Sequence, residues 1–300
     1  MSSTRTASLF PFLAIFGAVV CLGLGTSWAK NSLFPALGAQ GTTALRIGFS
    51  ALFMLLLWRP WRKLPTRAEL RVIAGYGAAL GAMNLAFYMS LRTLPFGIAV
   101  AIEFSGPLAV AIFSSRRPMD FVWVLLAVCG LGLLLPLGHE VSTLDPVGVL
   151  YALAAAVCWA TYIVFGKRVG HLPTGQTVSL GLAVAALVAM PFGVAHAGTA
   201  LLSPSLLMVG AAVAVLSSAI PISLEMMALR RLPRHAFGIM ISMEPAVAAI
   251  LALGLLGEQL SLSQWLAIGL IVGASMGSAM TAGRSAKRAA RPVLVQDGVS

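Results

Sequence analysis

Charged side chains are scarce in this 300-residue sequence. Asp, Glu, Lys and Arg together make up 10% of it, whereas hydrophobic residues make up 59%. Soluble globular domains average about 25% charged and about 45–50% apolar residues. This balance excludes a soluble globule and indicates a polytopic membrane protein.

Cysteine and motifs for chemistry are also rare. The three cysteines, Cys21, Cys129 and Cys158, all lie within apolar runs, where a thiol is most simply a small packing residue. The sequence contains no phosphate-binding glycine loop, no zinc-ligand spacing and no nucleophile motif, and its four histidines show no ligand spacing. We therefore expect no enzyme activity, no cofactor and no metal site.

The sequence is instead built from apolar runs of about 20 residues, the length of a helix that crosses a bilayer. We expect an all-α fold with ten membrane-spanning helices. The expected spans are 8–28, a run that ends at Trp58, 71–91, 96–114, 121–137, 147–165, 176–196, 205–229, 235–256 and 262–281.

The chain also divides into two similar halves. A polar connection, 138–146, separates a first five-helix repeat, 1–137, from a second, 147–283, and a basic tail, 284–300, follows. A shift of 138 positions relates residues of like type, carrying Leu94, Pro95, Pro107 and Asp120 onto Leu232, Pro233, Pro245 and Glu258. Because five is odd, the second repeat enters the membrane from the opposite side. We expect two inverted repeats, an architecture common among secondary transporters.

The net charge of +11 would suggest nucleic-acid binding in a soluble chain. In membrane proteins, however, Lys and Arg concentrate in cytoplasmic loops. With the N-terminus inside, every Lys and Arg falls on the inner side except Lys30 and Arg92, which fall outside, and Arg46, which lies within a span. We therefore expect both termini in the cytoplasm and no nucleic-acid partner.

Two carboxylates lie deep in the expected spans, each close to a proline. Glu103 precedes Pro107 by one helical turn, and Glu244 directly precedes Pro245. Proline leaves a backbone carbonyl without its partner, and an ionisable group at membrane depth marks a substrate or ion path by default. Such a carboxylate could exchange a proton or pair with a substrate ammonium. We favour this functional role over a structural ion pair or an interhelical hydrogen bond.

Two further charged residues lie within the expected spans. Arg46 needs an anionic partner or a water-filled cavity. Its planar guanidinium suits a substrate carboxylate and equally suits one of the glutamates, and the pair with a glutamate is our preferred interpretation. Glu225 precedes Arg230 by five residues, so that a structural role at the inner interface and a role in the site are equally supported.

Two polar pairs complete the candidate site. Asn84 and Tyr88 lie one turn apart in the third span, and Trp159 and Tyr162 lie close together in the sixth. Aromatic residues within spans more often pack or anchor at the interface. Cavity lining is therefore the second interpretation of these four residues, and we keep them as candidates.

Two long runs carry a family resemblance. They are PFGIAVAIEFSGPLAVAIFSSRRPMDFVWVLLAVCGLGLLLPLG and SLEMMALRRLPRHAFGIMISMEPAVAAI, and the short run TALRIGF adds to them. With the ten spans, they resemble the drug/metabolite transporter superfamily, of the EamA-like kind, and within it the exporters of threonine and homoserine in bacterial inner membranes. The resemblance extends to Ser278. It implies efflux of small neutral amino acids driven by the proton gradient, but it identifies no binding residue.

Two other functions are compatible with part of the pattern. A broader drug or metabolite exporter would need a larger aromatic cavity and would tolerate loss of Arg46. A membrane enzyme of lipid chemistry would need paired aspartates or a metal motif, and the sequence has neither. The expected partners are the lipid bilayer, an amino-acid substrate and protons. A glycine ridge, Gly269, Gly273 and Gly277, could serve a homodimer or packing within the monomer.

Overall fold

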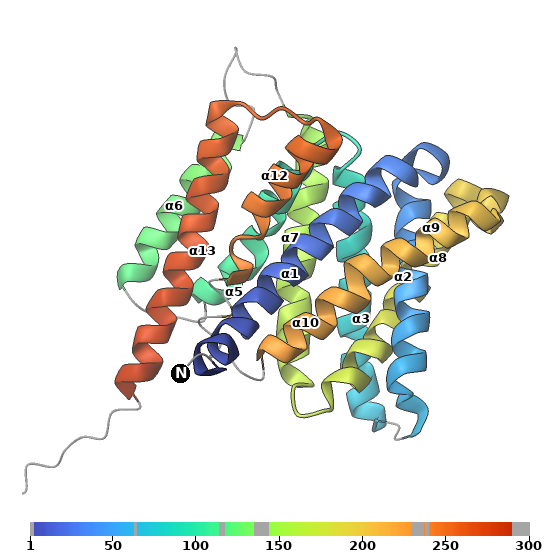
Figure 1. Ribbon diagram of the computed structural model, residues 1–300, viewed down its shortest axis with the longest axis horizontal. Helices are drawn as coiled ribbons and strands as arrows, with labels where there is room; N and C mark the ends of the chain where they lie inside the picture. Colours follow the sequence, from blue (N-terminus) through green and yellow to red (C-terminus); the bar gives the residue numbers. More distant parts are fainter. Residues whose placement is uncertain are drawn as a thin grey trace, which may run out of the picture.

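The computed structural model describes residues 3–62, 65–113, 118–134, 144–229, 237 and 240–289, and every regular element within these ranges is helical (Figure 1). Six helices are long and apolar enough to cross a membrane, and four further apolar helices are shorter. The prediction of an all-α polytopic membrane protein is confirmed.

The helices follow the apolar runs of the sequence. Those of the first half are α1 (Ser3–Ser32), α2 (Phe34–Trp58), η1 (Pro60–Arg62), α3 (Arg67–Ser90), α4 (Phe96–Glu103), α5 (Ser105–Phe113) and α6 (Pro118–Leu134). Those of the second half are α7 (Pro146–Arg168), α8 (Thr174–Ala197), η2 (Gly198–Leu202), α9 (Pro204–Ala214), η3 (Val215–Ala219), α10 (Ile220–Leu229), α12 (Glu244–Leu256) and α13 (Leu262–Ala289).

The predicted boundaries differ from these at a few ends. Helix α13 continues to Ala289, past position 283, where we expected the second repeat to end. Most of the predicted connection 138–146, and positions 290–300 of the predicted tail, lie outside the described residues.

The fourth apolar run, expected as one span over 96–114, is interrupted just before its proline. Pro107 cannot donate a hydrogen bond to the carbonyl of Glu103, and α4 ends at Glu103, with Phe104 in a turn before α5. The side chain of Ser105 donates to the carbonyl of Ile102 at 2.7 Å. The interruption leaves Glu103 at the end of a short helix.

A second interruption separates α9 from α10. The five residues of η3 form a π-helical turn, and Pro221 directly follows the first residue of α10. In a regular α-helix the proline ring would clash with the carbonyl of Ser217, which the wider turn relieves. Ser217 and Ser218 within this turn are both buried.

The helices pack in a regular set of pairs. Helix α2 packs against α8, α4 against α12, and α6 against α13. In addition, α3 contacts α7 and α8, α1 contacts α10 and α12, α5 contacts α7, and α2 contacts α9. Each half therefore packs mainly against the other, and the two halves share one bundle (Figure 1).

Glycines allow the closest of these contacts. Gly77 and Gly81 of α3 lie against backbone carbonyls of Gly181 and Ala185 of α8, a small-xxx-small spacing that lets two backbones approach closely. A Cβ at position 81 would lie 2.8 Å from the carbonyl oxygen of Ala185. The α3–α8 contact therefore has no room for a side chain at Gly81.

The predicted glycine ridge of the last span behaves differently. Gly277 packs on the ring of Trp123 in α6, as expected for a close helix contact. A Cβ at Gly269 or Gly273 would meet no atom within 4 Å. The interpretation that Gly269 and Gly273 pack within the monomer is therefore wrong for the described part of the chain. Both glycines face outward.

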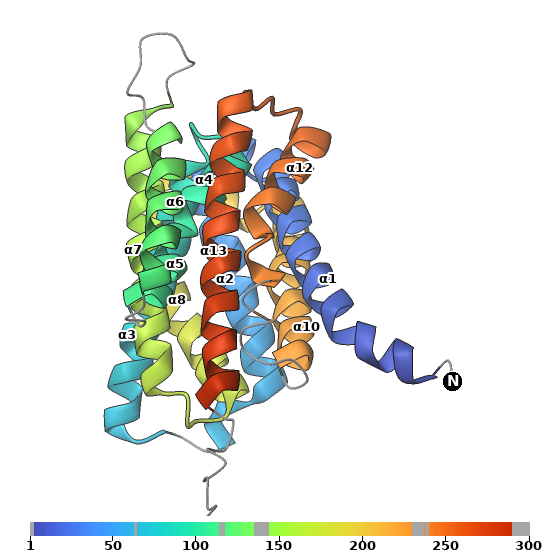
Figure 2. The same ribbon diagram turned by 90° about the vertical axis from the view of Figure 1, so that its left-hand side faces the viewer.

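The two ends of the bundle carry different charges. Figures 1 and 2 show the start of α1 and the end of α13 at the same end, together with the α2–α3 and α7–α8 connections. Described basic residues gather at these connections and at the helix ends beside them: Arg59, Arg62, Arg67, Arg71, Lys167 and Arg168. The opposite end carries Lys30, Arg92, Asp145 and Glu258.

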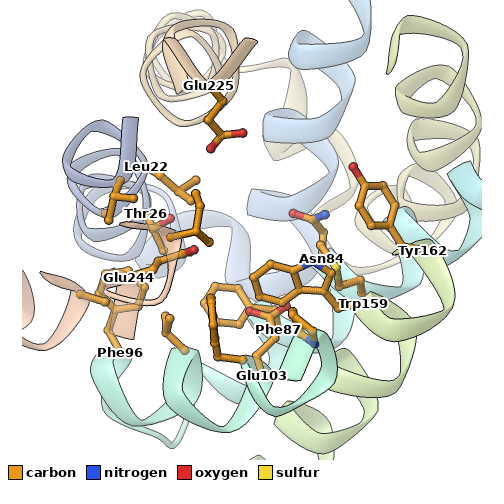
Figure 3. A pocket seen from close by; sticks show the side chains of 18 of the residues that line it. Leu22, Thr26, Asn84, Phe87, Phe96, Glu103, Trp159, Tyr162, Glu225 and Glu244 are labelled. Carbon is orange, nitrogen blue, oxygen red and sulfur yellow. The ribbon is translucent and has the colours of Figure 1, made fainter. Parts of the chain in front are cut away.

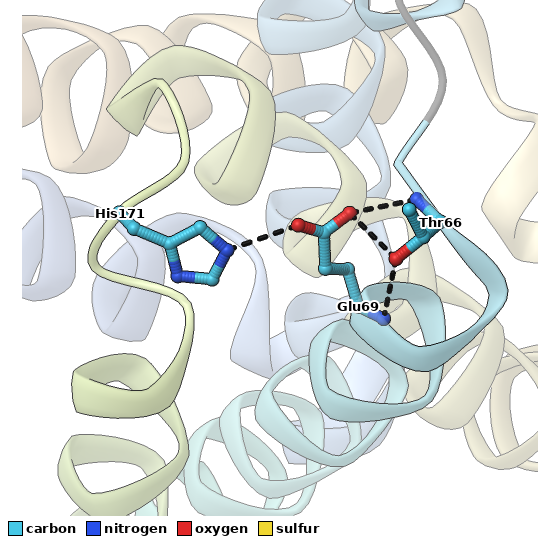
Figure 4. Close-up of polar contacts among 3 residues, drawn as sticks. All are labelled: Thr66, Glu69 and His171. Carbon is cyan, nitrogen blue, oxygen red and sulfur yellow. Dashed lines mark hydrogen bonds and ion pairs between the residues drawn. The ribbon is translucent and has the colours of Figure 1, made fainter.

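A capping box fixes the start of α3 at the basic end (Figure 4). The amide of Glu69 donates to the Thr66 hydroxyl at 3.3 Å, and the amide of Thr66 donates to Oε2 of Glu69 at 2.7 Å. This reciprocal arrangement satisfies two backbone donors. His171 Nε2 lies 2.9 Å from Oε1 of Glu69, so the α7–α8 connection is tied to the first turn of α3.

The two kinds of glycine predict opposite responses to a bulky side chain. Gly81→Leu should destabilise the protein by about 1–3 kcal/mol, because it overfills a packed contact. Gly273→Leu, the matched control on an open face, should leave stability unchanged. The measurement is thermal unfolding of both variants in detergent, and equal melting temperatures would contradict the packing described above.

Candidate functional site

A cavity of about 450 Å³ lies at the centre of the bundle, between the two halves. Its volume falls within the roughly 300–1,000 Å³ typical of small-molecule sites. Residues of α1, α2, α3, α4, α5, α7, α10 and α12 line it. Of the eight candidate residues, the structure brings seven to this cavity: Arg46, Asn84, Glu103, Trp159, Tyr162, Glu225 and Glu244.

Three carboxylates surround the cavity from three helices (Figure 3). Glu103 is the last residue of α4, Glu244 is the first of α12, and Glu225 lies in α10. The side chain of Glu103 is buried, with 6% of the residue exposed. Glu244 is a charged neighbour of Glu103, and Glu225 is a charged neighbour of Glu244. The three therefore form one electrostatic group.

Arg46 is the deep cation of this cavity, but a glutamate does not neutralise it. Its Nε donates to the Ser217 hydroxyl at 2.9 Å, and its Nη1 donates to Oδ1 of Asn84 at 2.6 Å. No ion pair joins Arg46 to any carboxylate that the structure describes. The preferred interpretation, a direct ion pair with a glutamate, is therefore wrong, because neutral polar groups bond the guanidinium instead, although Glu103 and Glu244 are charged neighbours of Arg46 without contacting it. The rest of its donor fork remains available.

The amide of Asn84 has both ends engaged. Its Oδ1 accepts from Arg46, and its Nδ2 donates to the carbonyl of Leu80 at 2.9 Å. These two bonds fix the orientation of the amide. Asn84 therefore lines the cavity mainly as a support for Arg46.

Tyr88 lies behind the site rather than in it. Its side chain is fully buried and does not line the cavity. The guanidinium carbon of Arg46 lies 5.2 Å from the centre of its ring, within the range of a cation–π contact. For Tyr88 the structure agrees with the first interpretation, packing, because the ring packs against Arg46 and does not line the cavity.

Trp159 and Tyr162 form the wall that α7 contributes (Figure 3). The Tyr76 hydroxyl of α3 donates to the Tyr162 hydroxyl at 2.8 Å, and the two rings stack with centres 4.5 Å apart. Trp159 packs edge to face against Phe104, with centres 5.4 Å apart. Both aromatic side chains are therefore held in place by residues outside α7.

Sequence reasoning missed the serines that organise Arg46. The Ser50 hydroxyl donates to the carbonyl of Arg46 at 2.7 Å and lies 2.8 Å from the hydroxyl of Ser218. Ser50 follows Arg46 by one turn, so its place on the same helix face was visible in the sequence. Ser217 and Ser218 gave no such signal, because only the π-helical turn directs both toward α2.

The arrangement is complementary to a small ligand that carries both charges. Arg46 offers free donors for an anionic group, and three carboxylates offer acceptors for a cationic one. None of the three carboxylates has a hydrogen bond or an ion pair with another described residue. Within the same part of the chain, no group of three or more His, Cys, Asp and Glu residues is placed to hold a metal ion.

Several known proteins are similar to this chain. The threonine/homoserine exporter RhtA of Escherichia coli strain K12 is 49% identical over 265 residues, which is 88% of this chain and 90% of that protein. RhtA of Salmonella typhimurium strain LT2 is 49% identical over 274 residues, covering 91% and 92%. YedA of E. coli K12, an uncharacterized inner membrane transporter, is 30% identical over 280 residues, covering 89% and 88%.

A family model and a solved structure agree with these relatives. The model of the EamA-like transporter family matches residues 146–280. A structure described only as "Crystal structure of protein" shares the fold, with a TM-score of 0.58 and 22% identity over 91% of this chain and 97% of that one. The family model and the relatives, which match along both halves, identify the chain as a transporter rather than an enzyme. The chain belongs to the EamA-like transporter family.

Proposed function

We propose that the protein exports threonine, homoserine and similar small neutral amino acids across the bacterial inner membrane as a secondary transporter. The central observation is the free donor fork of Arg46 in a cavity with three unpaired carboxylates. A zwitterionic amino acid supplies a carboxylate that can bind the Arg46 guanidinium and an ammonium that can bind the cavity carboxylates. The names of the 49% identical relatives support the same substrate class.

We further propose that the fold is a ten-helix inverted repeat. The shift of 138 positions moves α2 onto 172–196, close to α8, and α3 onto 205–228, close to the segment from α9 to α10. The helix contacts have the same symmetry, since α3–α7 corresponds to α10–α1, α3–α8 to α9–α2, and α5–α7 to α12–α1. Such repeats place the binding site near the midplane between the halves, and the cavity, which both halves line, supports this proposal.

The basic end of the bundle is, by this proposal, the cytoplasmic end. Single cysteines at Arg62 and Arg92, in a variant without the native cysteines, test it with a membrane-impermeant thiol reagent. Arg92→Cys should be labelled in intact cells, whereas Arg62→Cys should be labelled only in everted vesicles. The reverse pattern would overturn the proposed orientation.

The role proposed for Arg46 predicts how substrate recognition changes when this residue is replaced. Everted vesicles with the wild-type protein should take up labelled threonine when a proton gradient is imposed. Arg46→Lys keeps the charge but loses the planar fork. Since a hydrogen bond to a charged group is worth about 1.5–3 kcal/mol, uptake at low substrate concentration should fall by at least about tenfold.

The matched control for Arg46 is Arg92→Lys, an exposed arginine at the opposite end from the basic cluster. It should transport like the wild type. If Arg46→Lys also retains full uptake, the carboxylate of the substrate binds elsewhere. A broader drug or metabolite exporter would then be the better proposal.

The charge balance of the three carboxylates indicates which ion is coupled to transport. A single guanidinium cannot balance three negative charges, and the remaining charge must be met by a proton, the substrate ammonium or water in the cavity. We propose that at least one of Glu103, Glu225 and Glu244 carries the coupled proton. Because none of them is in direct contact with Arg46, replacement by neutral Gln breaks no contact ion pair.

Each Glu→Gln variant should therefore reach the membrane at wild-type level. At least one should lose accumulation driven by the pH gradient while still exchanging threonine for threonine. The measurements are gradient-driven uptake and counterflow in the same vesicles. Full pH-dependent accumulation in all three variants would exclude these carboxylates as coupling sites.

A further inference from the structure

An ion pair closes the end of the bundle away from the basic cluster. Lys30 Nζ lies 2.7 Å from Oε1 of Glu258, and their side chains are only 21% and 15% exposed. The other carboxylate oxygen of Glu258 accepts from the amide of Phe96 at 2.6 Å, and Lys30 also donates to the carbonyl of Leu94 at 3.4 Å. Glu258 thus joins the end of α1, the start of α4 and the segment after α12.

The three helices joined here are also helices of the cavity. Thr26 of α1 lines the cavity one turn before Lys30. Helix α4 runs from Phe96, which bonds Glu258, to Glu103 in the cavity. Helix α12 runs from Glu244 in the cavity to Leu256, with Glu258 two residues beyond. Both short helices therefore connect a cavity carboxylate directly to the ion pair.

The repeat relates this ion pair to a second pair of charges. A shift of 138 carries Lys30 onto Arg168, the last residue of α7, and Glu258 corresponds to Asp120, near the start of α6. Arg168 is exposed at the basic end. Positions that the repeat relates thus have the same sign of charge at opposite ends of the bundle.

From these observations, and resting on the proposed transport function and orientation, we propose that Lys30 and Glu258 form the outer gate of the transport path. The gate is closed in this structure and must separate for substrate to leave. Arg168 is the counterpart of Lys30 at the cytoplasmic end and stabilises the opposite state. Movement of α4 or α12 when a cavity carboxylate binds a proton or substrate then acts on the gate through a single rigid helix.

Accessibility of one cavity position tests the gate without any substrate. In a variant with Ser in place of the three native cysteines, Thr26→Cys is labelled from outside intact cells with a membrane-impermeant thiol reagent. Lys30→Met removes the ion pair but leaves the bond between Glu258 and Phe96. A partly exposed ion pair changes the ratio of open to closed protein by up to about fivefold. Loss of the pair should therefore raise the labelling rate of Thr26→Cys by a similar factor.

Glu258→Gln provides a second variant, since its amide oxygen still accepts from Phe96 while the charge is lost. It should raise labelling in the same way. Arg168→Met should have the opposite effect and lower labelling, because it weakens the state that is open to the outside. Unchanged labelling in both Lys30→Met and Glu258→Gln would overturn the outer gate, and unchanged or faster labelling in Arg168→Met would overturn its counterpart.

Two matched controls separate gating from general loosening. Asp145 caps α7 at the same end as Glu258, and a hydrogen bond from Thr93, with smaller contributions from the amides of Val147 and Gly148, lowers its pKa. Asp145→Asn thus removes a carboxylate that is charged at neutral pH without breaking the gate. Lys167→Met removes a charge beside Arg168. Neither should change labelling of Thr26→Cys, and a rise in Asp145→Asn equal to that in Lys30→Met would attribute the effect to loosening.

Failure of the gate and failure of the proposed function give different results. If the wild-type protein moves no labelled threonine, the proposed substrate is wrong, while the labelling experiment still decides the gate. If threonine transport is normal but labelling does not respond to Lys30→Met or Glu258→Gln, only the gate is wrong.

Discussion

The bilayer core offers no water to satisfy backbone polar groups, and this constraint decides where the chain can depart from a regular helix. Interrupted backbone at membrane depth is tolerated only where protein or a cavity covers it. The described chain has three such interruptions beside the cavity, at Phe104, in η3 and at the turn of Ser242 and Met243. Glu103 directly precedes the first of these, and Glu244 directly follows the third. The charged groups thus occupy the places where freed backbone already requires a polar environment.

The unpaired guanidinium of Arg46 follows from the same surroundings. A buried ion pair gains little over its desolvation cost, and removing one partner leaves an uncompensated charge. Here Ser217, Asn84 and the ring of Tyr88 stabilise the cation without neutralising it. The positive charge therefore stays available to a ligand. A carboxylate held permanently against Arg46 would stabilise the resting protein but would have to be displaced at every transport cycle.

The sequence could predict the helices and the charged residues of the site, but not how those residues pair. Apolar runs located the helices, and Pro107 marked the carbonyl of Glu103 as one without its usual partner, although we expected one unbroken span there. A charge within an apolar run is conspicuous, so Arg46 and the three glutamates could be found without a structure. The partners of Arg46 depend on the rotation of α2 relative to α3 and on the extra residue in η3, which no local pattern specifies. For the same reason Tyr88 could not be told from Asn84, its neighbour one turn away.

In the proposed repeat, some charged residues at the ends of the molecule have counterparts of the same charge, whereas those in the cavity do not. At the ends, a shift of 138 keeps the sign of two charges, since it relates Lys30 to Arg168 and Asp120 to Glu258, whereas the basic residues Arg59, Arg62, Arg67 and Arg71 have uncharged counterparts. In the cavity the same shift relates Arg46 to Val184, Glu103 to Ile241 and Glu225 to Phe87, so no charge is kept. A scaffold of two similar halves, with these two charges repeated at opposite ends, gives two states of similar free energy, which alternating access requires. An asymmetric cavity gives one binding site with one polarity, because its cation lies on one half only. Two gates and a single site are what a transporter needs to release the same substrate on either side, and the direction of net transport is then set by the coupled ion rather than by the fold.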